Sequence, residues 1–149
     1  MLQQKLSQQG HETLCPITIL YKNRSILVGH RHYQSTDGWK KISVWTIPGG
    51  RCDSNETVEQ ALRREVQEEV GINTFDIIDL IGEVPGAKEG DIVPIFFSTT
   101  TQDAQLMEPE KFSEWKWVSE FEYLTDEKYS GFNPDAREII VNYLKQRNK

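Results

Sequence analysis

Three glutamates within five residues are the side chains whose type and spacing could do chemistry. Glu65, Glu68 and Glu69 stand at positions i, i+3 and i+4, so on a helix their carboxylates share one face. Like charges at this spacing repel each other and weaken an isolated helix. A hard cation such as Mg²⁺, which binds through a few carboxylates together with substrate phosphates, would offset that repulsion. The alternative is an acidic helix face that is simply solvated.

The residues around these glutamates predict the helix that positions them. Thr57 and Gln60 have the spacing of a capping box, which marks a helix start. An apolar residue then recurs every four positions, and Gly71 follows where a left-handed helix cap is expected. The apolar positions are Val58, Leu62, Val66 and Val70. Gly49 and Gly50 precede the helix, and glycine allows a backbone to approach a ligand closely.

The remaining segments predict strands before and after this helix and a second helix near the end of the chain. Residues 13–21 and 25–32 are β-rich and flank a turn, which is typical of a hairpin. Pro94 indicates that its own strand is at an edge or bulged. The further predicted elements are strands at 43–47, 75–84, 91–100 and 112–118 and a helix at 135–145. Such an order predicts an α/β fold with a sheet flanked by helices.

The length and composition of the chain fit one globular domain. Its 149 residues contain no repeat and no low-complexity linker, so we expect a single domain over residues 1–149. Residues 1–12 are polar and are expected to be a loosely ordered lead-in. The chain has no apolar run of about 20 residues that could span a bilayer and no apolar signal segment. The sequence therefore predicts a cytoplasmic protein without a membrane partner.

The charge and cysteine content narrow the partners further. The 17 basic and 23 acidic residues give a formal net charge of −6, whereas a protein that binds duplex nucleic acid usually carries a basic face. We therefore expect no duplex nucleic acid as partner. Cys15 and Cys52 lack CxxC spacing, and no Cys/His cluster has zinc-ligand spacing. Both cysteines are expected to be reduced thiols.

The segment GRCDSNETVEQALRREVQEEVGI, residues 50–72, resembles the signature of the Nudix hydrolase family. Every fixed position of that signature agrees. The matching residues are Gly50, Glu56, Arg64, Glu65, Val66, Glu68, Glu69, Gly71 and Ile72. Seven positions with a fixed residue type, each at roughly 6% background, match by chance less than about once in a hundred million start sites. The flanking elements also suit the family, so the resemblance extends over residues 13–145.

This resemblance implies a Nudix fold, a mixed β-sheet sandwiched between α-helices, and metal-dependent hydrolysis of a nucleoside diphosphate linkage. It implies that Mg²⁺, or in some cases Mn²⁺, is held by Glu65, Glu68 and Glu69, with the Gly50 carbonyl as a further ligand. Either Glu65 or Glu68 would act as the catalytic base. The cation would neutralise charge on the phosphate oxygens and lower the pKa of a water, which then attacks phosphorus in line.

The resemblance also assigns roles to residues beside this glutamate face. Glu56 and Arg64 are expected to brace the loop against the helix by ion pairing or hydrogen bonds. Family members often place one more metal-binding glutamate ahead of the last strand. Glu108 and Glu110 are the candidates here, and Glu110 is the preferred one. Their alternative is a pair of solvated loop acids.

Residues outside the signature would select the substrate. The segments 108–118 and 45–50 resemble the MutT-like branch, which cleaves nucleoside triphosphates, including oxidised ones, to a monophosphate and pyrophosphate. Arg31 matches a position where relatives place an arginine against phosphate. Trp45 could stack on a base, and Asn133 matches an asparagine that some relatives use to read oxidised guanine. The alternatives are a surface arginine, a core aromatic side chain and a helix cap.

Other substrates and one other class of function stay open. Loop 33–41, with Trp39, Lys40 and Lys41, is longer than in compact nucleotide-sanitising relatives. Dinucleoside polyphosphates, nucleotide sugars and RNA 5′ ends are therefore alternatives to nucleoside triphosphates. A catalytically silent Nudix sensor is a further alternative, although such domains commonly lose signature glutamates that are all present here. In each case we expect a small-molecule nucleotide partner and a monomer or homodimer.

Overall fold

The computed structural model describes residues 1–34, 41–130 and 133–148. Most of loop 33–41 is outside these residues, including Trp39, Lys40 and the side chain of Lys41. The elements are α1 (Leu2–Ser7), β1 (Ile17–Lys22), β2 (Ser25–Gln34), β3 (Lys41–Thr46), α2 (Val58–Val70), β4 (Asp76–Pro85), β5 (Ile92–Thr99), β6 (Phe112–Ser119), α3 (Glu120–Thr125), the 3₁₀ helix η1 (Glu127–Ser130) and α4 (Pro134–Arg147).

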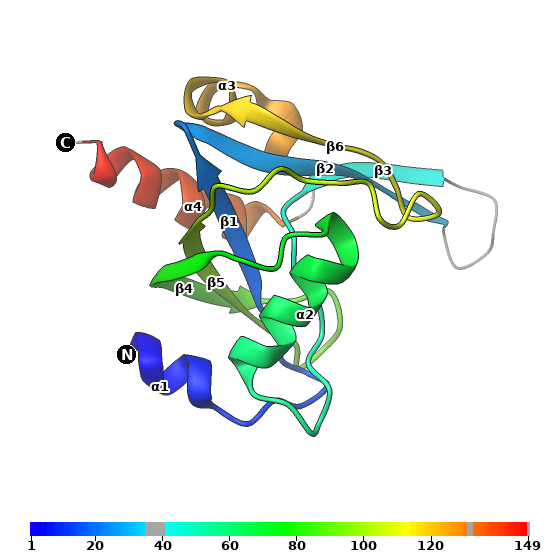
Figure 1. Cartoon of the computed structure of the whole chain (residues 1–149), viewed down its shortest axis with the longest axis vertical. Coiled ribbons are helices and arrows are strands. Elements are labelled where there is room, and N and C mark those ends of the chain that lie inside the picture. The colour runs from blue at the N-terminus through cyan, green and yellow to red at the C-terminus, as the bar shows by residue number, and fades with distance from the viewer. Residues whose placement is uncertain (35–40, 131–132, 149) are drawn as a thin grey trace.

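The strands form one mixed sheet with helices on both faces (Figure 1). Its order is β3-β2-β1-β5-β4, and β6 pairs with β2. Only the β1–β5 pair is parallel among the described strands, with Ile17 opposite Ile95, whereas the other pairs are antiparallel. The predicted α/β class, the hairpin and the mixed sheet between helices are confirmed.

Two apolar clusters hold the helices on the sheet. One cluster packs α4 and η1 against one face, with Ile19, Val28 and Phe97 of the sheet and Ile140 of α4 fully buried or nearly so. The other packs α1 and α2 against the opposite face. Its members include Leu6, Leu20, Leu27, Leu62, Val66, Val70 and Phe96. Strands that are apolar on both faces are expected where helices cover both sides of a sheet.

The predicted start and end of helix α2 are both confirmed. The Gln60 amide donates to the Thr57 hydroxyl at 3.2 Å, and the Thr57 amide donates to the Gln60 side chain at 2.9 Å. At the other end, Gly71 is left-handed with φ +72°, and its amide donates to the Gln67 carbonyl. The predicted apolar stripe is fully buried, and the glutamates flank it, with Glu69 buried as well.

Gly71→Ala should destabilise the protein by about 1 kcal/mol, because an L side chain resists the left-handed conformation. An added Cβ would have room, since its nearest neighbour is the Met107 sulfur at 3.4 Å. Urea unfolding measures the loss. Gly90 also has a positive φ, and an added Cβ there meets nothing within 4 Å. Gly90→Ala should therefore cost a similar amount. A much larger loss at Gly71 would show that side-chain contacts, and not backbone strain, decide the result.

The N-terminal segment differs from the expectation. Residues 1–12 are not a loosely ordered lead-in, because they contain helix α1, which packs on α2. Leu6 is 3% exposed in the core, and the Lys5 ammonium lies 2.7 Å from the Glu83 carboxylate of β4. The Gly10 amide also donates to the loop before α2. Tertiary contacts therefore order a segment that is too short and too polar to be helical alone.

One of the two alternatives for Pro94, an edge strand, is wrong. Its strand, β5, is not at an edge, because β1 and β4 flank it. Continuous pairing with β1 begins only at Ile95, the residue after the proline. The facing strand β4 shifts register between Leu80 and Gly82, next to the same position. The strand pairing is therefore irregular next to Pro94, whose nitrogen has no hydrogen to donate.

In the described part of the chain, no helix is both long and apolar enough to cross a membrane.

Candidate active site

Glu69 is the most buried of the three glutamates on α2. It is 6% exposed, and its Oε1 accepts a hydrogen bond of 2.9 Å from the Gly49 amide. Glu65 and Glu68 lie progressively further out, with side chains that are 19% and 50% exposed. The three carboxylates therefore run from the protein interior to solvent along one helix face.

The glycine turn before α2 lies directly against this face. A Cβ on Gly50 would lie 2.5 Å from the Glu65 carboxylate, which leaves room for glycine only. Gly49 has φ +148°, and a Cβ there would lie 2.3 Å from the Pro16 carbonyl oxygen. The Gly50 amide donates to that same carbonyl at 3.1 Å. The turn is thus fixed between β1 and α2, with its backbone in contact with Glu65.

Arg64 contacts several of the charged side chains on and near α2. Its guanidinium makes two hydrogen bonds to Glu56, at 2.7 and 3.1 Å. It also donates to Glu65 at 3.1 Å and to Glu68 at 3.2 Å. Glu56 in turn accepts from the Asp53 amide at 2.8 Å. The structure therefore places Glu56 and Arg64 between the loop and the helix, where the signature predicts a brace.

The environments of these acids separate their pKa values. Burial raises the pKa of Glu69 to about 8, with a smaller increase from the Glu65 charge, while the Gly49 amide opposes the change. Burial also raises the pKa of Glu65. The hydrogen bonds from Arg64 lower the pKa of Glu56. Opposite shifts among neighbouring carboxyl groups are a common property of functional sites.

Of the two candidate acids in the loop ahead of β6, Glu108 has the closer electrostatic relation to the glutamates of α2. The charge of Glu108 raises the pKa of both Glu65 and Glu69, so its carboxylate lies within electrostatic range of the pair. Glu108 is also bonded to Lys111 at 3.1 Å. Glu110 is exposed and, among the described residues, has no hydrogen bond or ion pair. The preference for Glu110 over Glu108 thus finds no support in this geometry.

Arg31 lies on the glutamate side of strand β2. Its charge lowers the pKa of Glu69, and its guanidinium carbon lies 4.8 Å from the Tyr33 ring centre and 5.1 Å from that of Phe112. The Arg31 Nε is buried and has no hydrogen-bond partner within the described residues. A buried donor without an acceptor is costly.

Trp45 and Asn133 do not join this cluster. Trp45 pairs in register with His30, one residue before Arg31, so alternation places both rings on the other face of β2 and β3. There the Trp45 ring stacks on His30 at 4.6 Å and meets the edge of Tyr129. Asn133 caps helix α4, because its side chain accepts from the Ala136 amide at 3.1 Å. The cap and packing alternatives account for both residues.

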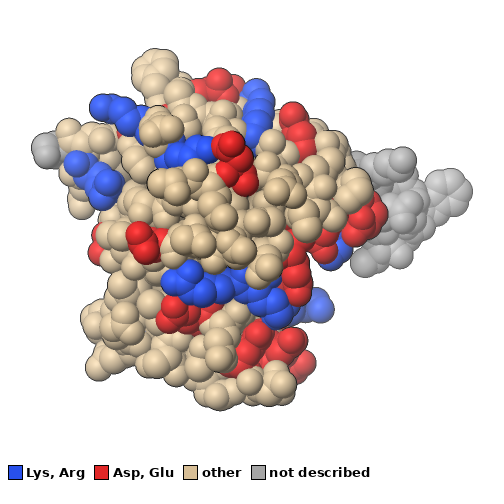
Figure 2. All heavy atoms as spheres, viewed as in Figure 1, with Lys and Arg blue, Asp and Glu red and all other residues tan. Residues whose placement is uncertain are grey.

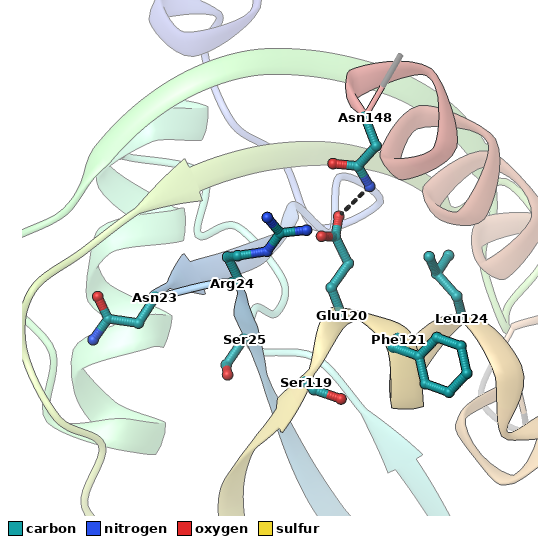
Figure 3. A pocket seen from close by; sticks show the side chains of 8 residues that line it. All are labelled: Asn23, Arg24, Ser25, Ser119, Glu120, Phe121, Leu124 and Asn148. Atoms are coloured by element: carbon teal, nitrogen blue, oxygen red, sulfur yellow. Dashed lines mark hydrogen bonds between the residues drawn. The ribbon is translucent and has the colours of Figure 1, made fainter.

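A separate hollow of about 380 Å³ lies between the β1–β2 turn and α3 (Figure 3). The side chains of Arg24 and Glu120 point into it, and Asn148 donates to Glu120 at 3.0 Å (Figure 3). The residues around it are Asn23, Arg24, Ser25, Ser119, Glu120, Phe121, Leu124 and Asn148. None of these belongs to the glutamate face, so this hollow is distinct from the candidate site.

The donor set on α2, which consists of carboxylates and a backbone carbonyl, fits a hard divalent cation. Within the described residues, no three His, Cys, Asp or Glu side chains form a group that could hold a metal. Glu65 and Glu68 instead accept hydrogen bonds from Arg64. Acidic and basic side chains accordingly interleave over α2 (Figure 2). Carboxylate and backbone oxygens are nevertheless the ligands that Mg²⁺ and Mn²⁺ accept.

A family model described as the NUDIX domain matches residues 15–143. The chain belongs to the Nudix family.

Two curated relatives show what this Nudix chain resembles. The 8-oxo-dGTP diphosphatase of Proteus vulgaris is 42% identical over 87 residues, which cover 58% of this chain and 74% of the relative. The RNA pyrophosphohydrolase of Erythrobacter litoralis is 31% identical over 101 residues, which cover 53% of this chain and 61% of the relative.

Solved structures show that the Nudix fold extends over nearly the whole chain. The MutT protein of Methanosarcina mazei Go1 superposes with a TM-score of 0.68 at 21% identity, covering 92% of this chain and 96% of that one. The expected Nudix fold is therefore confirmed. The chain spans less than two thirds of the length of the Erythrobacter relative.

Proposed function

We propose that this Nudix domain is a Mg²⁺-dependent pyrophosphohydrolase that cleaves a nucleoside triphosphate to a monophosphate and pyrophosphate. One observation carries this proposal. The three signature glutamates lie on one face of α2, where Glu69 is buried against the Gly49 amide and Glu65 lies against Gly50. Burying a carboxylate beside two further carboxylates is costly, and a bound cation would offset that cost.

The roles that we propose for the glutamates of α2 follow from how deeply each one is buried. Glu65, Glu69 and the Gly50 backbone would hold the cation, since they form the inner part of the face. A bound cation would supply charge neutralisation at the phosphates and activation of water. Glu68 is half exposed and so can reach solvent water, which favours it as the base over Glu65. Arg31, whose charge lies within electrostatic range of Glu69, would bind a phosphate group through its guanidinium.

The choice of a triphosphate substrate rests on the relatives. The Proteus relative is named for hydrolysis of 8-oxo-dGTP, and it shares more identity with this chain than the Erythrobacter enzyme. Neither Trp45 nor Asn133 supports recognition of an oxidised base, because their side chains are engaged in packing and capping. We therefore propose the triphosphate class without assigning the base.

A hydrolysis screen tests this proposal. Purified protein is incubated with Mg²⁺ and a panel of canonical and oxidised nucleoside triphosphates, dinucleoside polyphosphates, nucleotide sugars and triphosphorylated RNA, and products are identified. We expect monophosphate and pyrophosphate from at least one triphosphate, and none with EDTA. Preferential cleavage of the RNA end would replace the triphosphate by an RNA substrate. Nucleotide binding in calorimetry without turnover of any panel member would contradict enzymatic function.

Glu108→Gln should weaken Mg²⁺ activation, whereas Glu110→Gln should leave it unchanged. Glu108 lies within electrostatic range of Glu65 and Glu69, so its charge adds to the attraction for a cation. Residues that support metal ligands typically cost about 10- to 100-fold in affinity or activity when they are changed. The Mg²⁺ concentration for half-maximal hydrolysis measures the effect. Equal effects of the two variants would contradict the placement of Glu108.

A further inference from the structure

An ion pair connects the glycine turn to the distant β4–β5 turn. Arg51 immediately follows Gly50, and its guanidinium makes two parallel hydrogen bonds to Asp91, at 2.8 Å from Nη1 and 2.7 Å from Nη2. Its Nη1 also donates to the Glu12 carbonyl at 2.8 Å. A bidentate arginine–carboxylate pair fixes orientation as well as distance, which a lysine cannot do.

The acid of this pair is held rigidly. The Asp91 side chain is 3% exposed, compared with 39% for Arg51. Its Oδ2 also accepts a hydrogen bond of 3.1 Å from the Lys88 amide, and the Gly86 amide donates to the Asp91 carbonyl at 3.0 Å. A Cβ on Gly86 would lie 2.6 Å from the Asp91 Cβ. Asp91 is therefore a fixed point in the β4–β5 turn, and the more exposed Arg51 is anchored to it.

The backbone of Arg51 connects the same residue to the glutamate face. Its carbonyl accepts a hydrogen bond of 3.1 Å from Arg64, the side chain that also bonds Glu65 and Glu68. Its chain neighbour Gly50 lies against the Glu65 carboxylate. Arg51 is thus attached by its side chain to the β4–β5 turn and by its backbone to α2, with the proposed metal ligands beside it.

We propose that Arg51 and Asp91 are positioning residues of the Nudix site, which hold the Gly50 backbone against the Glu65 carboxylate. This inference rests on the proposed function, because it assigns the pair a purpose in metal binding. Neither side chain is one of the proposed metal ligands. The pair acts instead through the placement of its neighbour, and an ion pair is in general a weak source of stability compared with apolar packing.

Asp91→Asn tests the proposal, because it keeps the shape of the side chain and removes its charge. In the nucleotide-free protein, Mn²⁺ affinity measured by electron paramagnetic resonance should fall about 10- to 100-fold. With dGTP as the probe, kcat should fall while KM stays unchanged. In the metal-free protein, amide hydrogen exchange of residues 49–53 should accelerate. Arg51→Lys keeps the charge but cannot make the two parallel hydrogen bonds to Asp91. It should show the same pattern in weaker form.

The matched control is Glu83→Gln, which neutralises the acid of the Lys5–Glu83 ion pair between α1 and β4. It should lower the melting temperature without changing Mn²⁺ affinity or exchange at residues 49–53. If Asp91→Asn and Arg51→Lys behave like this control, the proposal is overturned. If the wild-type protein binds no Mn²⁺ and hydrolyses no nucleotide, the proposed function fails. Unchanged exchange in both variants would then overturn the positioning role by itself.

Discussion

Glu69→Gln should reduce kcat by at least about 100-fold, since changes to residues that merely support metal ligands already cost 10- to 100-fold. Glu69 is the deepest acid of the site, and its Oε1 is oriented by the Gly49 amide. Glutamine keeps the shape and the carbonyl acceptor for that amide but offers no charge to a cation. Steady-state hydrolysis at saturating Mg²⁺, with the substrate that the screen identifies, measures the loss.

The same substitution should not destabilise the fold above neutral pH. In the metal-free protein, burial raises the pKa of Glu69 to about 8, above its ordinary value near 4.5. The protonated form is thus the one that folding favours. Its contribution to stability is fully present below the ordinary pKa and is lost as the pH rises through the folded value. Thermal unfolding should therefore show wild-type protein losing more stability than Glu69→Gln between pH 5 and pH 9.

Glu59→Gln is the control for both measurements. Glu59 is on the same helix, and its carboxylate pairs with Arg63 at the surface. Its replacement should leave kcat and the pH dependence of stability as in the wild type, because an exposed pair contributes little. Full activity in Glu69→Gln would rule out the metal-binding role of this residue. A large stability loss at pH 8 would rule out the argument from burial.

Arg64→Met should lower the free energy of unfolding by about 2 kcal/mol, because it leaves three carboxylates without their cation. The loss is moderate because these ion pairs are partly hydrated. Glu56 would lose two hydrogen bonds, and its side chain is only 13% exposed. Glu65 and Glu68 would repel each other without a counter-ion. Urea unfolding of the metal-free protein measures the change, and added Mg²⁺ should recover part of it.

Arg63→Met provides the comparison for this variant. Arg63 is the adjacent arginine, and its ion pair with Glu59 is 38% exposed on both sides. It also donates to the Phe75 carbonyl and lies over the Phe75 ring. Mg²⁺ should not restore stability to Arg63→Met, because this side chain is remote from the metal ligands. Equal recovery by Mg²⁺ in both variants would contradict the role of Arg64 as counter-ion.

Local patterns in the sequence predicted the elements with strong periodicity or strong end signals. Helix α2 has a full apolar stripe, a capping box and a terminal glycine, and all three are present in the structure. Helix α1 has only Leu2 and Leu6 as apolar positions, so its order depends on contacts with α2 that no local pattern encodes. The interior location of Pro94 likewise depends on strand order, which hydrophobic alternation does not determine.

The candidate site divides in the same way. Helical spacing alone placed Glu65, Glu68 and Glu69 on one face. The contacts that give each acid a different environment come from far along the chain. Gly49 is 20 residues from Glu69, and Asp91 is 40 residues from Arg51. Sequence spacing also could not choose between Glu108 and Glu110, since the course of the loop determines which one lies near the cluster.

The hydrogen bonds of Arg64 to both Glu65 and Glu68 affect the order of folding and cation binding. Because the Arg64 guanidinium neutralises part of the charge of these acids, we expect a newly made chain to fold without a divalent cation. Folding and metal loading then become separate events in time. Cation binding by these acids would require Arg64 to release them, while its two hydrogen bonds to Glu56 could remain. We therefore expect the purified protein to be folded in EDTA as well as in Mg²⁺.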